Sequence, residues 1–590
     1  MSKPMRTFLL GLVAGVVLVF VLAGLAAGVA VIIGQGGSGL PSEFALVVRL
    51  DGSVPEHVEA ELPQFLTGRS GPDLTLYRLV QTILRAVDDE SVKALVLECG
   101  WSASGWAKAQ ELRWAVEEFK ASGKPVWAYL TIPSREGYYI GSLADHVVIQ
   151  PESYLNLSGL RAEVMFFKGT LDKLGVEVDL IRSGRYKSAG EPFTREEMSP
   201  EFRAILEETL EEFYTQLLEG IASGRGESAD HWRAVLDEGP FTAKEAQTHR
   251  LADAELHKDA FYDLLSEAVE VEDLPKVGAN RYSGQANRAT GRGRKTIAIL
   301  HAIGTITSGT SQSDPFGVQP TTLGADSFRS QLTQLREDED IDGVILRIDS
   351  PGGDAIASEQ MLHDVRRLAE EKPLVVSMST VAASGGYYIA SVPDASIVAY
   401  PGTYTGSIGV FTIRYNLRKL YEKLGISKDV LTKGRFAGID SDYKPMTAEE
   451  RAKLSTYVDA IYQVFLQRVS EGRGVDTGSI RELAEGRVWI GTQAAENGLV
   501  DELGGYVKAI ELVKEAAEIG EDEAVRIVSY PLKRSPLEAL FSRGRNVAVD
   551  GLLQAPGVGE FYSAWSQIVA HAGRLRSGPM YIAPYTLTVQ

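Results

Sequence analysis

The sequence predicts an α/β protein built from two tandem domains of related sequence, and two observations support this prediction. Short runs of β-branched and apolar residues alternate with longer helical patterns, which is typical of parallel strands joined by crossover helices. Motifs also recur along the 590-residue chain at a spacing of about 250 residues, which suits two domains and not a solenoid. The length agrees, because single hydrophobic cores rarely grow beyond about 250–300 residues.

The repeat is visible over most of each half. From Ala382 the second half reads A-A-S-G-G-Y-Y-I-A-S, and from Pro133 the first half reads P-S-R-E-G-Y-Y-I-G-S. The run D-K-L-G-V at 172–176 likewise recurs as E-K-L-G-I at 422–426. So steady a spacing indicates a duplication.

Domain boundaries follow from the extent of the repeat. We expect the first repeat over residues 42–273, a linker over 274–295, the second repeat over 296–532 and a tail of unknown role over 533–590. The linker is rich in Gly, Asn, Arg and Ser and has little apolar periodicity. In the second repeat, apolar runs and helical patterns predict strands at 344–348, 374–376 and 397–398 and helices at 355–370 and 448–473.

The N-terminus carries a membrane-targeting pattern. Residues 8–34 form an uninterrupted apolar and glycine-rich stretch preceded by Lys3 and Arg6. A spanning helix needs about 20 residues, whereas the apolar part of a cleaved signal peptide has about 7–15. We therefore predict an uncleaved, single-pass anchor at 8–34 after a cytoplasmic segment at 1–7. Because positive residues tend to stay cytoplasmic, the body is expected on the extracytoplasmic, periplasmic side of the inner membrane.

Charge and cysteine content limit the kinds of partner and covalent link that the chain can have. The net charge of −19 argues against nucleic acid, because phosphate binders usually carry a basic stripe. Cys99 is the only cysteine, so no intrachain disulfide can form, and its apolar surroundings predict a buried thiol.

The two copies differ at positions that could carry chemistry. Residues 384–385 (Ser-Gly) of the second copy align with 135–136 (Arg-Glu) of the first. Further along the chain the first copy has the reactive group instead, because its Lys187 aligns with Ala437 of the second copy. A serine and a lysine together can form a hydrolase that needs no histidine, metal or cofactor.

Ser384 is the candidate nucleophile. It follows a strand-like run and precedes Gly385 and a predicted helix, and such a turn exposes its central side chain. The amide of Gly385 could then stabilise an oxyanion. A serine that caps a helix is the alternative.

The segment D-S-P-G-G at 349–353 offers a second amide, that of Gly353, after a predicted buried strand. A plain strand-to-helix turn is the alternative. The first copy reads G-W-S-A-S at 100–104 instead, and glycines needed only for the fold should occur in both copies.

Lys187 is the candidate base. There is no histidine between His363, in a charged helical pattern, and His571, and His301 lies in a predicted core strand, so a Ser-His-Asp triad has weak support. As a base Lys187 must be neutral, which requires burial to lower its pKa from about 10.4 to about 7–8. An exposed loop lysine is the alternative.

Ser407, in T-G-S-I-G at 405–409, replaces Leu157 of the first copy. A hydroxyl at an otherwise apolar position indicates a hydrogen bond to the base. A hydroxyl satisfied within its own turn is the alternative.

These motifs resemble the signal peptide peptidase A family of membrane-anchored serine proteases in its long, duplicated form. The resemblance covers about residues 44–530 and rests on four motifs in order: G-R-Y-K-S-A at 184–189, S-P-G-G at 350–353, A-A-S-G-G-Y-Y-I at 382–389 and T-G-S-I-G at 405–409. Asp349 departs from the asparagine often found before S-P-G-G in that family.

The resemblance implies Ser384 as nucleophile, Lys187 as general base, Ser407 as the group that orients the lysine, and the Gly353 and Gly385 amides as the oxyanion hole. It also implies tandem crotonase-like or Clp-protease-like domains in a dome-shaped homo-oligomer, by family a tetramer, that faces the membrane. The implied substrates are residual signal peptides and other short apolar peptides.

Two other functions remain open from the sequence. A crotonase-type acyl-thioester enzyme could use the same glycine amides without a serine nucleophile. A membrane-tethered assembly scaffold without activity is the other, although no catalytic group is missing.

Overall fold

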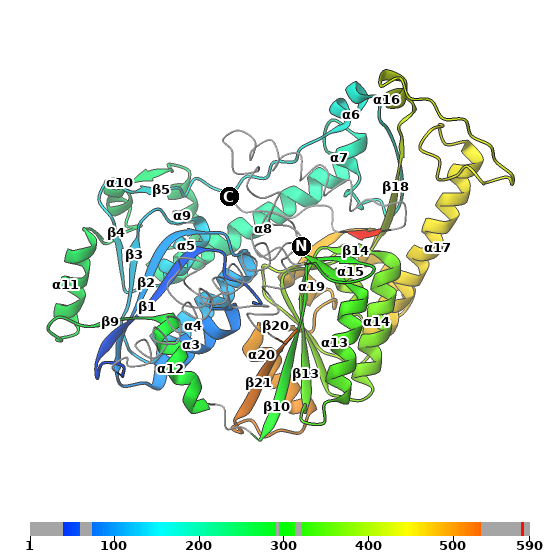
Figure 1. Ribbon diagram of the computed structural model, residues 1–590. Coiled ribbons are helices and arrows are strands. Elements are labelled where there is room, and N and C mark those ends of the chain that lie inside the picture. Colours follow the sequence, from blue (N-terminus) through cyan, green and yellow to red (C-terminus); the bar gives the residue numbers. More distant parts are fainter. Residues whose placement is uncertain (1–38, 59–73, 291–293, 313–320, 533–579, 583–590) are drawn as a thin grey trace, which may run out of the picture.

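Two largely parallel sheets, one in each repeat, organise the computed structural model of the chain (Figure 1). The structure describes residues 39–58, 74–290, 294–312, 321–532 and 580–582. The predicted α/β class in two tandem units is confirmed. The predicted anchor at 8–34 lies outside the described residues, and within them no helix is long and apolar enough to cross a membrane.

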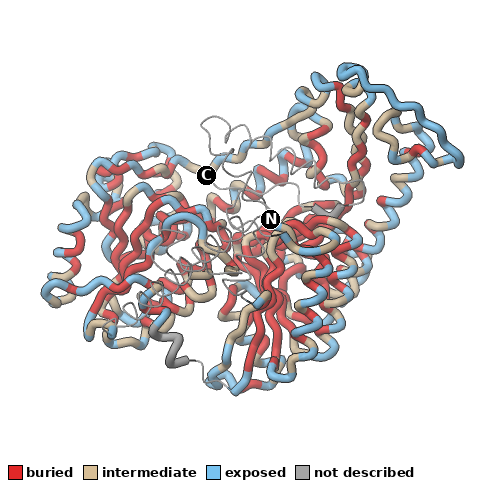
Figure 2. The backbone as a smooth tube through the Cα atoms, viewed as in Figure 1, coloured by how far each residue is buried: buried red, intermediate tan, exposed pale blue. Residues whose placement is uncertain are grey.

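The first sheet has the order β8-β4-β3-β2-β1-β9, with every neighbouring pair parallel. Helices cover both faces, so its central strands are buried, as Figure 2 shows in red. Its strands are β1 (Phe44–Gly52), β2 (Val92–Ser102), β3 (Val126–Leu130), β4 (His146–Ile149), β8 (Ala254–Glu255) and β9 (Lys276–Gly278), and β5 (Tyr154–Leu155) pairs separately with β7 (Phe241–Thr242). The helices of this repeat are α3 (Leu76–Asp88), α4 (Trp106–Ala121), α5 (Arg135–Gly141), α6 (Lys168–Leu174), α7 (Glu191–Thr194), α8 (Pro200–Arg225), α9 (Ala229–Leu236), α10 (Ala243–Thr248), α11 (Lys258–Ala268) and α12 (Ala279–Thr290).

The second sheet repeats this plan. Its order is β19-β17-β15-β13-β10-β21, with β16 and β20 branching from β15, and only β17–β19 is antiparallel among its described pairs. The strands are β10 (Lys295–Ile303), β13 (Gly343–Ser350), β15 (Leu374–Ala383), β16 (Ile397–Ala399), β17 (Tyr404–Gly406), β19 (Val488–Ile490), β20 (Glu502–Leu503) and β21 (Val525–Tyr530). The helices are α13 (Ala325–Glu337), α14 (Ala355–Ala369), α15 (Gly385–Ala390), α16 (Arg418–Lys423), α17 (Ala448–Arg473), α18 (Thr477–Leu483), α19 (Gly491–Glu496) and α20 (Tyr506–Ala516).

A third sheet joins the two repeats. Its order is β12 (Thr322–Gly324), β11 (Thr305–Thr307), β14 (Gly352–Asp354), β22 (Met580–Ile582), β18 (Val410–Asn416) and β6 (Glu177–Ser183). Strand β6 belongs to the first repeat and pairs antiparallel with β18 of the second, from Ser183 opposite Val410 to Glu177 opposite Asn416. This strand pair brings the segment after β6 to the second repeat.

The repeats also share a hydrophobic core. One buried cluster combines Leu79 of α3 and Leu112 of α4 with Ile297, Ile345 and Val513 of the second repeat. The segment 274–295, expected to be a linker, contains β9, which extends the first sheet beside β1, and helix α12.

Candidate active site

Ser384 lies in a strained turn between β15 and α15. Its backbone has φ +56° and ψ −114°, a region that residues other than glycine rarely adopt. The turn is held by the Ser384 amide, which donates to the Gly406 carbonyl at 2.7 Å, and by the Tyr388 amide, which donates to the Ser384 carbonyl at 2.8 Å. The side chain of Ser384 caps no amide of α15, so the alternative of a helix-capping serine does not apply. Its hydroxyl is therefore available to another group.

Lys187 reaches this turn from the other repeat. Strand β6 ends at Ser183, and the chain then turns against a loop of the second repeat, where the Tyr186 amide donates to the Glu485 carbonyl at 2.8 Å. The contact is close, because a Cβ on Gly486 would lie 2.6 Å from the Lys187 nitrogen. Pairing between the repeats thus places the lysine.

The side-chain nitrogen of Lys187 lies between two serines. Its Nζ is 2.6 Å from Ser384 Oγ, 3.0 Å from Ser407 Oγ and 2.8 Å from the Ser407 carbonyl oxygen. All three residues are completely buried. The alternative of an exposed loop lysine is therefore wrong.

Burial also determines the charge of this lysine. Desolvation holds the pKa of Lys187 well below its ordinary value, because the charged form loses its hydration. Among the described residues no carboxylate pairs with Lys187 to offset this loss. A neutral amine beside a serine hydroxyl can accept its proton.

Ser407 is held as firmly as Ser384. It follows β17, has a φ of +53°, and its amide donates to the Arg487 carbonyl at 2.7 Å. Its hydroxyl and its carbonyl oxygen both lie within hydrogen-bond distance of Lys187 Nζ.

The two glycine amides lie close together. A Cβ on Gly385 would be 3.1 Å from the Gly353 nitrogen and 2.7 Å from Ser358 Oγ. A Cβ on Gly353 would be 2.0 Å from the Ile306 carbonyl oxygen, so neither position accepts a side chain. The loop before Gly353 is fixed by Ser350, whose hydroxyl donates to the Gly304 carbonyl at 2.6 Å and accepts from the Gly352 amide at 3.2 Å.

The first repeat holds a carboxylate at the corresponding place. Glu136, which aligns with Gly385, accepts from the Ser104 amide at 2.8 Å and from the Gly105 amide at 3.1 Å. Ser104 aligns with Gly353. Burial raises the pKa of Glu136, and the two amide donors oppose that rise. The backbone at this position of the fold therefore binds oxygen acceptors.

A strand from the tail lies beside the glycine loop. Strand β22 pairs antiparallel with β14, with Gly353 opposite Tyr581, and its other edge pairs with β18 at Phe411 opposite Met580. Peptide backbone can thus bind as a strand between β14 and β18.

The structure brings together all five residues predicted for the site. The sequence analysis did not find Lys108 of α4, whose Nζ lies 3.1 Å from Asp349 Oδ2. The one signal for such a partner was the acidic residue directly before the glycine loop.

Comparison with known proteins identifies the family of the chain. The family described as Peptidase family S49 matches residues 118–272 and again 366–520, one match in each repeat. The chloroplastic serine protease SPPA of Arabidopsis thaliana is 33% identical over 496 residues, which cover 82% of this chain and 72% of the relative. Protease 4 of Haemophilus influenzae is 30% identical over 515 residues, covering 84% and 82%. A putative signal peptide peptidase SppA of Enterococcus faecium is 32% identical over 257 residues, covering 42% and 74%.

The duplicated match and the long alignments agree in extent with the two repeats seen in the structure. The resemblance to the long, duplicated form of the signal peptide peptidase A family is thereby confirmed. The chain belongs to peptidase family S49 and is a serine endopeptidase.

Proposed function

We propose that this endopeptidase works through a Ser-Lys dyad, with Ser384 as nucleophile and Lys187 as general base. The observation that carries the proposal is the 2.6 Å separation of Lys187 Nζ and Ser384 Oγ, with both side chains wholly buried. A lysine kept neutral by burial can take the serine proton near neutral pH, which a solvated lysine cannot.

The reaction proceeds in two halves. Lys187 Nζ accepts the Ser384 hydroxyl proton while Oγ forms a bond to the carbonyl carbon of the peptide. When the C–N bond breaks, the protonated lysine donates that proton to the leaving amine, and the acyl group remains on Ser384. A water molecule then gives its proton to Lys187 and attacks the ester, and the lysine returns this proton to Ser384 as the carboxyl product leaves.

The Gly353 and Gly385 amides are assigned to the oxyanion of each tetrahedral intermediate. Their proximity supports this assignment, as does the first repeat, where the Ser104 amide, which aligns with that of Gly353, donates to the Glu136 carboxylate. Ser407 orients Lys187 through its hydroxyl and its carbonyl oxygen.

The peptide substrate is proposed to bind as a strand between β14 and β18. The pairing of β22 with both strands supports this mode, because it shows that the two edges accept an extended backbone. We propose residual signal peptides and other short apolar peptides as substrates, in line with the name of the Enterococcus faecium relative. Residues 8–34 would anchor the body on the extracytoplasmic side of the inner membrane.

A homo-oligomer, a tetramer by family resemblance, is also proposed. The first repeat pairs β6 with β18 of the second repeat, whereas the stretch of the second repeat that aligns with β6 and the residues just before it exposes Leu424, Val430 and Leu431, which are 64%, 47% and 95% accessible. A second copy, offering its first repeat to this segment, would cover these side chains. Sedimentation of Leu431→Asp against the wild type tests this, and an unchanged mass would contradict it.

Covalent labelling with a fluorophosphonate tests the nucleophile. We expect the wild type to be labelled at Ser384, and Ser384→Ala to lose both labelling and peptide cleavage. Ser391→Ala is the matched control, because this buried serine at the end of α15 donates to the Tyr387 carbonyl and not to the dyad. Labelling of Ser384→Ala at the wild-type rate would overturn the assignment, and a wild type that is not labelled would favour an acyl-thioester chemistry that needs no serine.

A further inference from the structure

Strand β15 bulges just before it reaches Ser384. It pairs with β13 from Leu374 opposite Val344 to Met378 opposite Ile348, and the next pair is Ala382 opposite Ser350. Between these pairs β13 advances by two residues and β15 by four, so residues 379–381 leave the ladder. The path of this bulge sets where Ser384 begins its turn.

Asp349 holds the bulge to the glycine loop. Its Oδ1 accepts from the Val381 amide at 3.2 Å, which satisfies a donor that the ladder has lost. Its own carbonyl accepts from the Gly304 amide at 2.9 Å, and Ser350 begins the loop that leads to Gly353. One aspartate therefore links the approach to the serine with the approach to the oxyanion amide.

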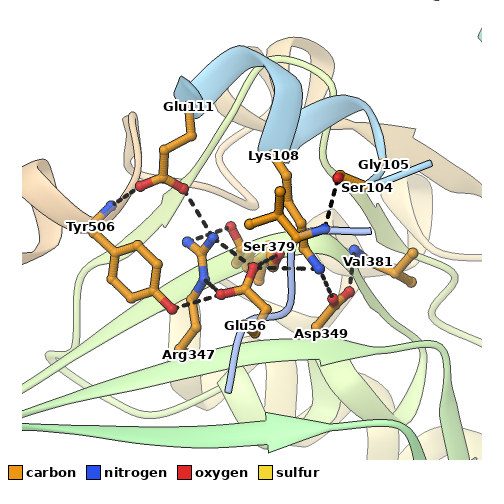
Figure 3. A network of polar contacts seen from close by, with 12 residues as sticks. Glu56, Ser104, Gly105, Lys108, Glu111, Arg347, Asp349, Ser379, Val381 and Tyr506 are labelled. Carbon is orange, nitrogen blue, oxygen red and sulfur yellow. Dashed lines mark hydrogen bonds and ion pairs between the residues drawn. The ribbon is translucent and has the colours of Figure 1, made fainter. Parts of the chain in front are cut away.

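The partner of this aspartate comes from the other repeat. Lys108 of α4 places Nζ 3.1 Å from Asp349 Oδ2 and 3.8 Å from Glu56 Oε1 (Figure 3). The side chains of Lys108 and Asp349 are only 8% and 19% exposed. Burial alone would lower the pKa of Lys108, but Asp349 and Glu56 raise it above its ordinary value, so the lysine is charged.

A second contact from the first repeat reaches the same bulge. Ser379 donates its hydroxyl to Glu56, whose carboxylate also accepts from Arg347 Nε at 3.2 Å and Nη2 at 3.0 Å. Arg347 is 1% exposed and bonds Glu111 of α4 at 3.0 Å as well. Glu56 thus holds one end of the bulge directly, and Lys108 holds the other end through Asp349 (Figure 3).

The first repeat has no acidic residue at the position of Asp349. There the ladder between β2 and β3 runs from Leu95 opposite Val126 to Cys99 opposite Leu130 and ends with that pair. Gly100 aligns with Asp349 and offers no side chain that could hold a bulge. The acidic anchor therefore accompanies the serine and is not required by the fold as such.

We propose that Lys108 is a positioning residue for Ser384, acting through Asp349 and the Val381 amide. It touches no reacting atom. The first repeat therefore supplies the support for the nucleophile as well as the base. This inference rests on the proposed role of Ser384.

A double-mutant cycle on Lys108 and Asp349 tests it. Lys108→Met leaves Asp349 partly buried and unpaired, and we expect the rate of fluorophosphonate labelling per folded molecule and kcat to fall about 10–100-fold. In Asp349→Asn the amide oxygen can still accept from Val381 while Lys108 keeps Glu56, so the expected loss is small. In the Asp349→Asn background Lys108→Met should cost less than about threefold, because no unpaired carboxylate remains.

The matched control is Lys120→Met on the same helix, which removes a lysine paired with Asp145 at 2.9 Å inside the first repeat. It should label at the wild-type rate. Thermal unfolding of each variant gives the folded fraction, so a merely structural role would lower the unfolding temperature and leave the labelling rate per folded molecule unchanged. That result, or an equal loss from Lys108→Met in both backgrounds, would overturn the proposal. Loss of labelling in Ser384→Ala tests the nucleophile separately.

Discussion

The two repeats use one turn of the backbone in two ways. In the first repeat the amides of Ser104 and Gly105 hold the carboxylate of Glu136, and the turn is satisfied from within. In the second repeat Gly385 stands where Glu136 would be, so the same place receives no side chain from that position. The difference shows how a duplicated fold can keep an oxygen-binding turn as a structural element in one copy and as proposed catalytic machinery in the other.

The largest loss of activity is expected when the proposed base, which the first repeat supplies, is removed. Lys187→Ala should lower kcat/KM by about 10⁴-fold or more, because the serine loses its proton acceptor. Lys433→Ala, an exposed lysine in the corresponding stretch of the second repeat, is the matched control and should be neutral. Cleavage by Lys187→Ala at the control rate would show that the repeats do not share one active site.

The pH dependence of kcat/KM and of stability also tests whether Lys187 is the base. Because burial lowers the pKa of Lys187, kcat/KM should fall about tenfold per pH unit below that lowered value and level off above it. The unfolded chain keeps the ordinary lysine pKa and binds more protons, so the free energy of unfolding should rise with pH relative to Lys187→Met. Activity that levels off only above about pH 10.4 would mean an unshifted lysine.

Ser407 should matter less than the dyad. Ser407→Ala removes one of the two oxygens that Ser407 offers to Lys187, while the carbonyl at 2.8 Å remains. We expect kcat to fall about 5–20-fold, the value of one hydrogen bond at a polar buried site. The variant is compared with the wild type at saturating peptide, and an unchanged kcat would remove Ser407 from the mechanism.

Truncation of the tail tests whether the substrate binds to the strand edges that β22 occupies. A chain that ends at Leu532 lacks β22, which pairs with β14 beside Gly353. If substrate uses the same edges, KM should fall about three- to tenfold with kcat unchanged, because a competing strand is gone. A raised KM would show that β22 builds the site instead.

The smallest effect on activity is expected in the first repeat. Glu136→Ala leaves the Ser104 and Gly105 amides without their acceptor, which should lower the free energy of unfolding by about 2 kcal/mol. Glu118→Ala, an exposed glutamate on α4, is the control for stability. In both variants kcat/KM should equal that of the wild type, and a large loss in Glu136→Ala would mean that the first turn also serves catalysis.

The two residues of the proposed dyad could be predicted from the sequence because the two copies could be compared with each other. Ser384 and Lys187 stood out as residues that the opposite copy lacks, and local patterns located helix 448–473 at the bounds that the structure shows. Local patterns also sufficed for the buried strands.

Long-range pairing was beyond that reasoning. The β6–β18 and β14–β22 pairs join residues far apart in the chain, and no local periodicity specifies such partners. The expected linker contains β9 and α12, which its polar composition did not indicate. Tyr282 attaches this segment to the first repeat, because its ring packs against Phe44 and its hydroxyl donates to Asp89 at 2.8 Å. The Lys108–Asp349 pair likewise depends on how the repeats dock.

The β6–β18 pairing has a consequence for the life of the chain in the cell. A ribosome makes the repeat with the lysine first and the repeat with the serine second, and domains generally fold in that order. Until β18 has emerged and paired with β6, the nascent chain holds a lysine without its serine. The proposed active site can therefore form only after the part of the second repeat that carries Ser384 and β18 has been synthesised.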